Sequence, residues 1–302
     1  MRKYLVPIVV TVSAIVAHSQ SAALQVVMSS PRSSFVQGEP VYVWVDYYNE
    51  TATEIGLPKG YLFGFDVLKV QTRDGAVVSR AGVQADRAPL GGSNQVERVA
   101  PKEHVVFFAN LLEHVNLTDA GDYVVQIFIP NHAPELFLDQ KNPAMPASHL
   151  VHGPIQSNRW EFTIAPGNGE AFELVSKPLR DKTSGTFGLC QNAPTIVEKY
   201  PNSAYGPYAV MCELDRLLYG EGQGPEKLPD RLKSAEVLID RLRRQPGFEY
   251  LNIALLRYAE RLTHVGQKQA AAKLLSELQQ DERLDVARLY LLQLRSNKTE
   301  SE

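Results

Sequence analysis

The sequence predicts a two-domain chain in which a β-sandwich or barrel precedes a small helical domain. Apolar residues alternate with a period of two in the first half and recur at helical spacing in the second half. The change falls at residues 166–169, a Pro-Gly-Asn-Gly cluster that is typical of a domain boundary. A chain of 302 residues is long enough for two such domains.

The composition excludes several classes of protein. Hydrophobic residues make up 44% and charged residues 22%, an ordinary globular balance that excludes collagen, wholesale disorder and a multi-pass membrane protein. The formal net charge of −3 gives no general attraction to nucleic acid, so we expect no nucleic-acid partner. Two cysteines are too few for a disulfide-dense scaffold or for most cysteine-rich zinc modules.

The first 23 residues have the pattern of a secretory signal peptide. Arg2 and Lys3 precede an apolar tract, Leu5–Val16, and small residues follow it. A bilayer span needs about 20 apolar residues, so the tract is too short to be one. We therefore expect a periplasmic or secreted protein with no integral membrane span after cleavage.

Residues 24–166 are predicted to form the β domain. Val41, Val43 and Val45 alternate with Tyr42, Trp44 and Asp46. Similar short runs follow around residues 62–70, 104–112, 123–129 and 160–164, and turn residues separate them.

This half resembles an immunoglobulin-like domain. Asp119, Gly121 and Tyr123 match the Asp-x-Gly-x-Tyr element that opens strand F, in which the tyrosine hydroxyl bonds back to the backbone. Val45 and Val125 stand where antibody-type domains carry their two cysteines. With apolar residues at both positions, this half is similar to the immunoglobulin-like modules of exported bacterial proteins. The resemblance implies an antiparallel β-sandwich but no catalytic chemistry.

Two features of this half are candidates for binding. Tyr42, Trp44 and Tyr48 share one face of a strand. They could form a binding stripe for peptide or sugar, or they could pack against the helical domain. The second feature is the proline-rich connection 130–156, which carries His132, His149 and His152. These histidines could hold zinc or copper, or lie in a solvated loop, but they lack the H-E-x-x-H helix of metalloproteases.

Residues 170–295 are predicted to be helical, with a frayed polar tail at 296–302. Leucine and alanine recur at helical spacing around residues 232–242, 271–278 and 284–294. The stretch from Leu255 to Leu278 resembles one hairpin of a tetratricopeptide-like repeat, with Ala259 and Ala271 as the small residues at which the helices approach. Residues 220–233 depart from the repeat and suggest an inserted loop. The resemblance implies a surface for a protein partner; a compact bundle is the alternative.

Cys190 and Cys212 are predicted to form a disulfide. An exported protein meets an oxidising compartment, and both cysteines lie in the helical half. If one helix ends near Pro201 and the next begins near Ser203, each cysteine lies 11 residues from Pro201, on opposite sides of the turn. The two side chains would then face each other across a helical hairpin; two buried free thiols are the alternative.

No set of catalytic residues stands out in the sequence. It lacks a Gly-x-Ser-x-Gly elbow, a phosphate-binding loop and a dinucleotide-binding glycine motif. We therefore expect a non-enzymatic exported interaction or scaffold protein without a cofactor, whose partner is another exported or envelope protein. The alternatives are an extracytoplasmic enzyme or metal-binding protein that uses loop 130–156, and a carbohydrate-binding or adhesive module that uses the aromatic stripe.

Overall fold

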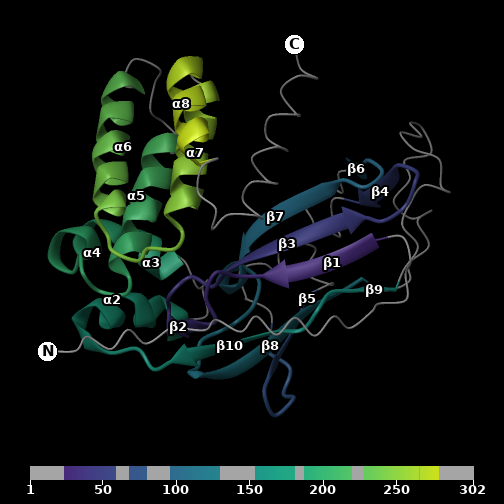
Figure 1. The fold of residues 1–302 in the computed structure, drawn as a ribbon. Coiled ribbons are helices and arrows are strands. Elements are labelled where there is room, and N and C mark those ends of the chain that lie inside the picture. Colours follow the sequence, from purple (N-terminus) through teal and green to yellow (C-terminus); the bar gives the residue numbers. More distant parts are fainter. Residues whose placement is uncertain are drawn as a thin grey trace, which may run out of the picture.

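The computed structural model describes residues 24–58, 68–79, 96–129, 154–180, 187–219, 228–264 and 266–278. The predicted signal peptide, nearly all of loop 130–156 and the predicted tail lie outside these residues. A β-rich part comes first and a helical part follows, in the order that the sequence predicts (Figure 1).

The strands of the β-rich part form two main sheets and a short ribbon. The first sheet has the order β1-β3-β7, with β1 at Leu24–Ser29, β3 at Tyr42–Asn49 and β7 at His104–Asn110. The second has the order β2-β10-β8-β5, formed by Ser34–Val36, Trp160–Ala165, Gly121–Ile129 and Leu68–Thr72, and β9 (Ile155–Gln156) also pairs with β8. The ribbon pairs β4 (Ile55–Pro58) with β6 (Val96–Val99). All these pairs are antiparallel except β2 with β10.

The β-rich part has a hydrophobic core of its own. Because side chains alternate across a strand, Val43, Val45 and Tyr47 point from β3 into this core and are fully buried. Phe162 of β10 and Ile127 of β8 enter the same buried cluster from the second sheet. One buried cluster therefore contains side chains from both main sheets.

Seven helices follow within the described residues. They are α2 (Gly169–Arg180), α3 (Phe187–Gln191), α4 (Ala193–Lys199), α5 (Gly206–Tyr219), α6 (Leu228–Arg243), α7 (Leu251–His264) and α8 (Lys268–Leu278). A short 3-10 helix, η2 (Leu111–Glu113), precedes β8. None of the helices in the described part has the length and apolar character needed to cross a bilayer.

The helical spacing in the sequence marks the faces that become buried. In α6, Ala235, Ile239 and Leu242 point into the core, as their spacing predicts. Helices α7 and α8 pack against one another, with Ala259 and Ala271 both buried. The run around residues 284–294 lies outside the described residues.

Two helix boundaries near the disulfide differ from the prediction. The helix that carries Cys190 ends at Gln191 instead of continuing to Tyr200, because Asn192 leaves helical geometry and Pro194 has no N–H to donate to the Cys190 carbonyl. The Asn192 side chain donates to the Gly188 and Leu174 carbonyls, at 2.9 and 3.0 Å. The helix after Pro201 begins at Gly206 rather than near Ser203. A side chain there would collide with the Pro201 carbonyl oxygen, 2.1 Å from an added Cβ atom, so only glycine fits.

The predicted inserted loop is also shorter than the sequence suggested. Helix α6 begins at Leu228, so the stretch 228–233 is helical instead of loop. Pro229 falls in the first turn of α6, where a missing N–H costs no intrahelical bond. Proline therefore marks the start of this helix rather than the interior of a loop.

The helical part closes its core with residues from the β-rich part. Tyr42 and Trp44 of β3 and Val106 of β7 belong to the same buried cluster as Leu189, Met211 and the inner faces of the helices. The helices stand beside the end of the sheets at which β1 ends and β3 begins (Figure 1). The first part of β3, from Tyr42 to Val45, is thus buried on both faces, one in each core.

Candidate functional site

The predicted cysteine pair forms a disulfide. Cys190 and Cys212 are joined, with their Cα atoms 5.1 Å apart, and the bond ties α3 to α5. The pairing was predicted from equal distances to one turn, yet helix α4 intervenes between α3 and that turn. A disulfide fits an exported protein.

The predicted aromatic stripe divides between two environments. Tyr42 and Trp44 are each only 8% exposed. Tyr42 packs against Tyr208 and Tyr250, and Trp44 belongs to the same buried cluster as the helices. This is the packing role that the sequence left open, and it leaves these two rings no surface for a ligand. Tyr48, farther along β3, is half-buried and stacks on His104 with ring centroids 4.5 Å apart.

An acid–histidine pair lies beside Tyr48. The Asp46 carboxylate is 2.9 and 3.0 Å from Nδ1 of His104, which orients the imidazole. Burial raises the pKa of Asp46, and its bond to His104 opposes that shift. Among the described residues no serine or cysteine is hydrogen-bonded to His104, so the pair lacks the nucleophile of a catalytic triad.

The three candidate metal ligands cannot be placed. His132, His149 and His152 all lie outside the described residues. Within the described ranges, no group of three or more histidine, cysteine, aspartate or glutamate side chains comes together as a metal site.

The seam between the two parts has a polar centre. Glu39 is 3% exposed, and its carboxylate lies 2.6 Å from Nη1 of Arg32. Arg32 also reaches the Tyr208 hydroxyl at 3.3 Å, and Ser30 and Tyr250 share a hydrogen bond of 3.2 Å. Burial first, and then the nearby Glu39 carboxylate, raise the pKa of Tyr208 far above its ordinary value. The phenol thus stays neutral and bridges the two parts.

Gln37 joins three segments at the other side of the seam. Its backbone carbonyl accepts from the Tyr205 hydroxyl at 2.7 Å, and its side-chain amide donates to the Thr118 carbonyl at 2.9 Å. The amide oxygen accepts from the backbone N–H of Gly167, also at 2.9 Å. One residue therefore fixes the loop before β8, the connection to α2 and the turn before α5 relative to one another.

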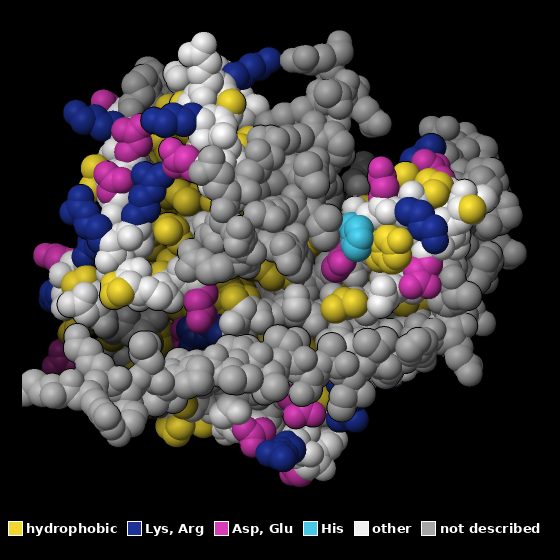
Figure 2. All heavy atoms as spheres, in the orientation of Figure 1, with side chains coloured by type: hydrophobic (Ala, Val, Ile, Leu, Met, Phe, Trp, Pro, Cys, Tyr) yellow, Lys and Arg dark blue, Asp and Glu magenta, His cyan; other side chains and the backbone are white. Residues whose placement is uncertain are grey.

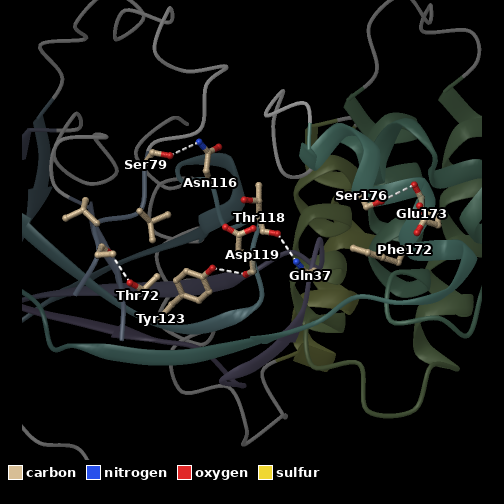
Figure 3. Close-up of a pocket in the computed structure, with 13 residues that line it drawn as sticks. Gln37, Thr72, Ser79, Asn116, Thr118, Asp119, Tyr123, Phe172, Glu173 and Ser176 are labelled. Atoms are coloured by element: carbon tan, nitrogen blue, oxygen red, sulfur yellow. Dashed lines mark hydrogen bonds between the residues drawn. The ribbon is translucent and has the colours of Figure 1, made fainter. Parts of the chain in front are cut away.

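A cleft of about 740 Å³ opens beside Gln37, between the β-rich part and α2. Figure 3 shows its two walls, with β-part residues such as Thr72, Asn116 and Asp119 facing Phe172, Glu173 and Ser176 of α2. The complete lining is Gln37, Thr72, Ala76, Val77, Val78, Ser79, Asn116, Thr118, Asp119, Tyr123, Phe172, Glu173 and Ser176. The size is that of a pocket for a drug-sized ligand or a few side chains.

Local structure sets the position of each wall. On the helix side, the Phe172 ring packs so closely on Gly167 that an added Cβ atom would lie 2.3 Å from it. On the β side, the Tyr123 hydroxyl donates to the Asp119 carbonyl at 2.7 Å, which is the backbone bond expected of the Asp-x-Gly-x-Tyr element. Ser79 and Asn116 are joined by side-chain and backbone bonds. Many of the polar groups of the walls therefore support the fold.

The cleft is acidic and partly apolar. Asp119 and Glu173 are the charged residues of its described lining, which contains no lysine, arginine or histidine. Burial first, and then the Asp119 carboxylate, raise the pKa of Tyr123, so this phenol is neutral at physiological pH. Val77 is 78% exposed within the cleft. The arrangement can bind a ligand, and its described lining contains no histidine, cysteine or lysine.

Sequence reasoning missed this cleft. Its lining comes from segments near residues 37, 76, 117 and 173, which are far apart in the chain. The one signal was the Asp-x-Gly-x-Tyr element, which was interpreted as scaffold.

Comparisons with known proteins give no family. No family model matches the sequence, and no curated protein matches it. Among solved structures, the native conformation of Escherichia coli alpha-2-macroglobulin, solved by cryo-EM, is similar with 11% sequence identity and a TM-score of 0.24. The alignment covers 84% of this chain but only 16% of that chain. A similarity this low supports no functional argument.

Proposed function

We propose that this chain is an exported, non-enzymatic interaction protein, and that a partner protein docks in the cleft between its β-rich and helical parts. The observation that carries the proposal is the cleft itself, an open cavity whose walls are held in place by the shared core and by Gln37. A preformed concave site between two structural units is a common location for ligand binding.

The finer description of the two parts belongs to the same proposal. We interpret the β-rich part as an immunoglobulin-like sandwich, because its two main sheets share one core and Tyr123 makes the expected corner bond. We interpret the helical part as tetratricopeptide-like, because α7 and α8 pack against one another and both Ala259 and Ala271 are buried. Folds of both kinds commonly act by presenting a binding surface.

Export is supported by the disulfide and by the pattern of residues 1–23. Disulfides persist in the periplasm and outside the cell but are rare in the cytosol. The proposed partner is therefore another exported or envelope protein.

Site-specific photo-crosslinking would test the docking site. A photoreactive amino acid replaces Val77 in the cleft or, as a matched control, Val237 on α6, which is also exposed at 65%. We expect the Val77 probe to crosslink a discrete envelope protein that then binds the purified chain, and the Val237 probe not to. Identical patterns from both positions, or none from Val77, would contradict docking in the cleft.

A further inference from the structure

The walls of the cleft offer two kinds of contact. Val77, Val78 and Phe172 supply apolar surface, and Asp119 and Glu173 supply negative charge. Val77 is exposed and lies on a segment that folds back on β5. In this segment the Val78 N–H donates to the Val70 carbonyl, and Val77 forms an isolated antiparallel β-bridge with Gln71. Val77 is 78% exposed at the cleft, so a ligand bound there would remove apolar surface from water.

The charged side chains in the described lining of the cleft are both acids, Asp119 and Glu173. Two acids close to the lining in sequence already have partners, because Asp122 pairs with Arg73 at 3.5 Å and the Tyr200 hydroxyl donates to Glu170 at 2.7 Å. A described lining with two carboxylates and no basic residue favours a cationic ligand.

Asp119 is placed to meet a cation. Its backbone carbonyl is used by Tyr123, but within the described residues its carboxylate has no hydrogen-bonded or ion-paired partner. It is an exposed residue of the β wall, opposite the wall formed by α2 (Figure 3). By contrast, acids on the outer helical surface lie among basic side chains, as in the Arg243–Asp240 and Arg243–Glu277 pairs (Figure 2).

We propose that the cleft binds a cationic segment of the partner that carries both lysine or arginine side chains and aliphatic ones. The cations would lie against Asp119 and Glu173, and the aliphatic side chains against Val77 and Phe172. The inference rests on the proposed docking function and adds the chemistry of the partner.

The direct test is fluorescence anisotropy with a labelled heptapeptide composed of lysine and valine. Two comparison peptides replace every lysine by glutamine or by glutamate. We expect binding in the order lysine, glutamine, glutamate, with the lysine peptide at least tenfold tighter than the glutamate peptide at low ionic strength. The difference should shrink at 0.15 M salt, at which the Debye length is about 8 Å.

Charge-neutral variants locate the contact. Asp119→Asn and Glu173→Gln should each weaken binding of the lysine peptide by about threefold, and together by about tenfold. Glu161→Gln, which removes one exposed charge from the outer surface of β10, is the matched control and should change binding by less than twofold. Val77→Ser should weaken binding of all three peptides alike.

The outcomes separate this inference from the docking proposal. If no peptide binds, if the glutamate peptide binds as tightly as the lysine peptide, or if the double variant behaves like Glu161→Gln, the cationic segment is excluded. Crosslinking from Val77 to an envelope protein would then still support docking of a partner with other chemistry. Loss of crosslinking from Val77 would remove both proposals together.

Discussion

The two cores of this molecule differ in how they are completed. Every residue of the β cluster lies between Leu24 and Ile164, so the β-rich part closes its core with its own side chains. The helical cluster instead includes Tyr42, Trp44 and Val106 from β3 and β7. The helical core therefore depends on the β-rich part, because it is completed by one face of the first sheet. Within the described residues, the core between the sheets contains no residue of helices α2–α8.

The largest expected effect comes from removing the central contact of the shared core. Trp44→Ala should lower the free energy of unfolding by about 3–5 kcal/mol, because a large buried aromatic ring leaves a cavity behind. Denaturant unfolding followed by circular dichroism at 222 nm measures the loss mainly in the helices. A loss below about 1 kcal/mol would mean that the ring contributes little to the helical core.

The disulfide should stabilise the helical core alone. Its loop of 22 residues predicts a contribution of about 3 kcal/mol from the reduced entropy of the unfolded chain, less any native strain. The double variant Cys190→Ser, Cys212→Ser should therefore unfold at lower denaturant in the helical signal. Unchanged stability relative to the oxidised protein would show that α3 is held to α5 by packing alone.

The buried ion pair of the seam should contribute less. Arg32→Met would leave the Glu39 carboxylate buried without its cation and should cost about 2 kcal/mol, since the Arg32 side chain is 28% exposed. Adding Glu39→Gln to that variant should restore part of the loss. A double-mutant cycle measures the coupling energy between Arg32 and Glu39. A coupling energy near zero would show that the ion pair does not stabilise the seam.

The smallest effect is a pH dependence confined to the β-rich part. Burial lowers the pKa of His114 below its ordinary value of 6.5, so the unfolded chain binds this proton more readily than the folded one. Stability should then fall as pH drops through 6.5 toward the folded pKa, and change no further below it through this group. His114→Gln should flatten this part of the stability profile. An unchanged profile would assign the acid sensitivity to other groups.

Local patterns predicted the elements better than they predicted what covers them. The alternation along β3 correctly predicted two faces. It could not distinguish an aromatic ring that binds a ligand from one that is buried in a core. Tyr42 and Trp44 took the second role because the helices lie over them. The pairing of Cys190 with Cys212 was confirmed, although Asn192 breaks the helix on which the argument depended.

The cleft was beyond sequence reasoning for a physical reason. Gln37 carries no motif, and its importance arises only when residues 118, 167 and 205 come within hydrogen-bonding distance of it. Tertiary contacts of this kind leave no local period in a sequence.

The most direct test asks whether the helical core and its contact with Trp44 are lost together. The chain has two tryptophans, so Trp160→Phe leaves Trp44 as the one fluorescent reporter of the seam. We expect the Trp44 emission and the circular dichroism at 222 nm to change at the same denaturant concentration, with a blue-shifted, buried emission before the transition. A shift of Trp44 emission to the solvent-exposed range while the helical signal stays intact would contradict the shared core.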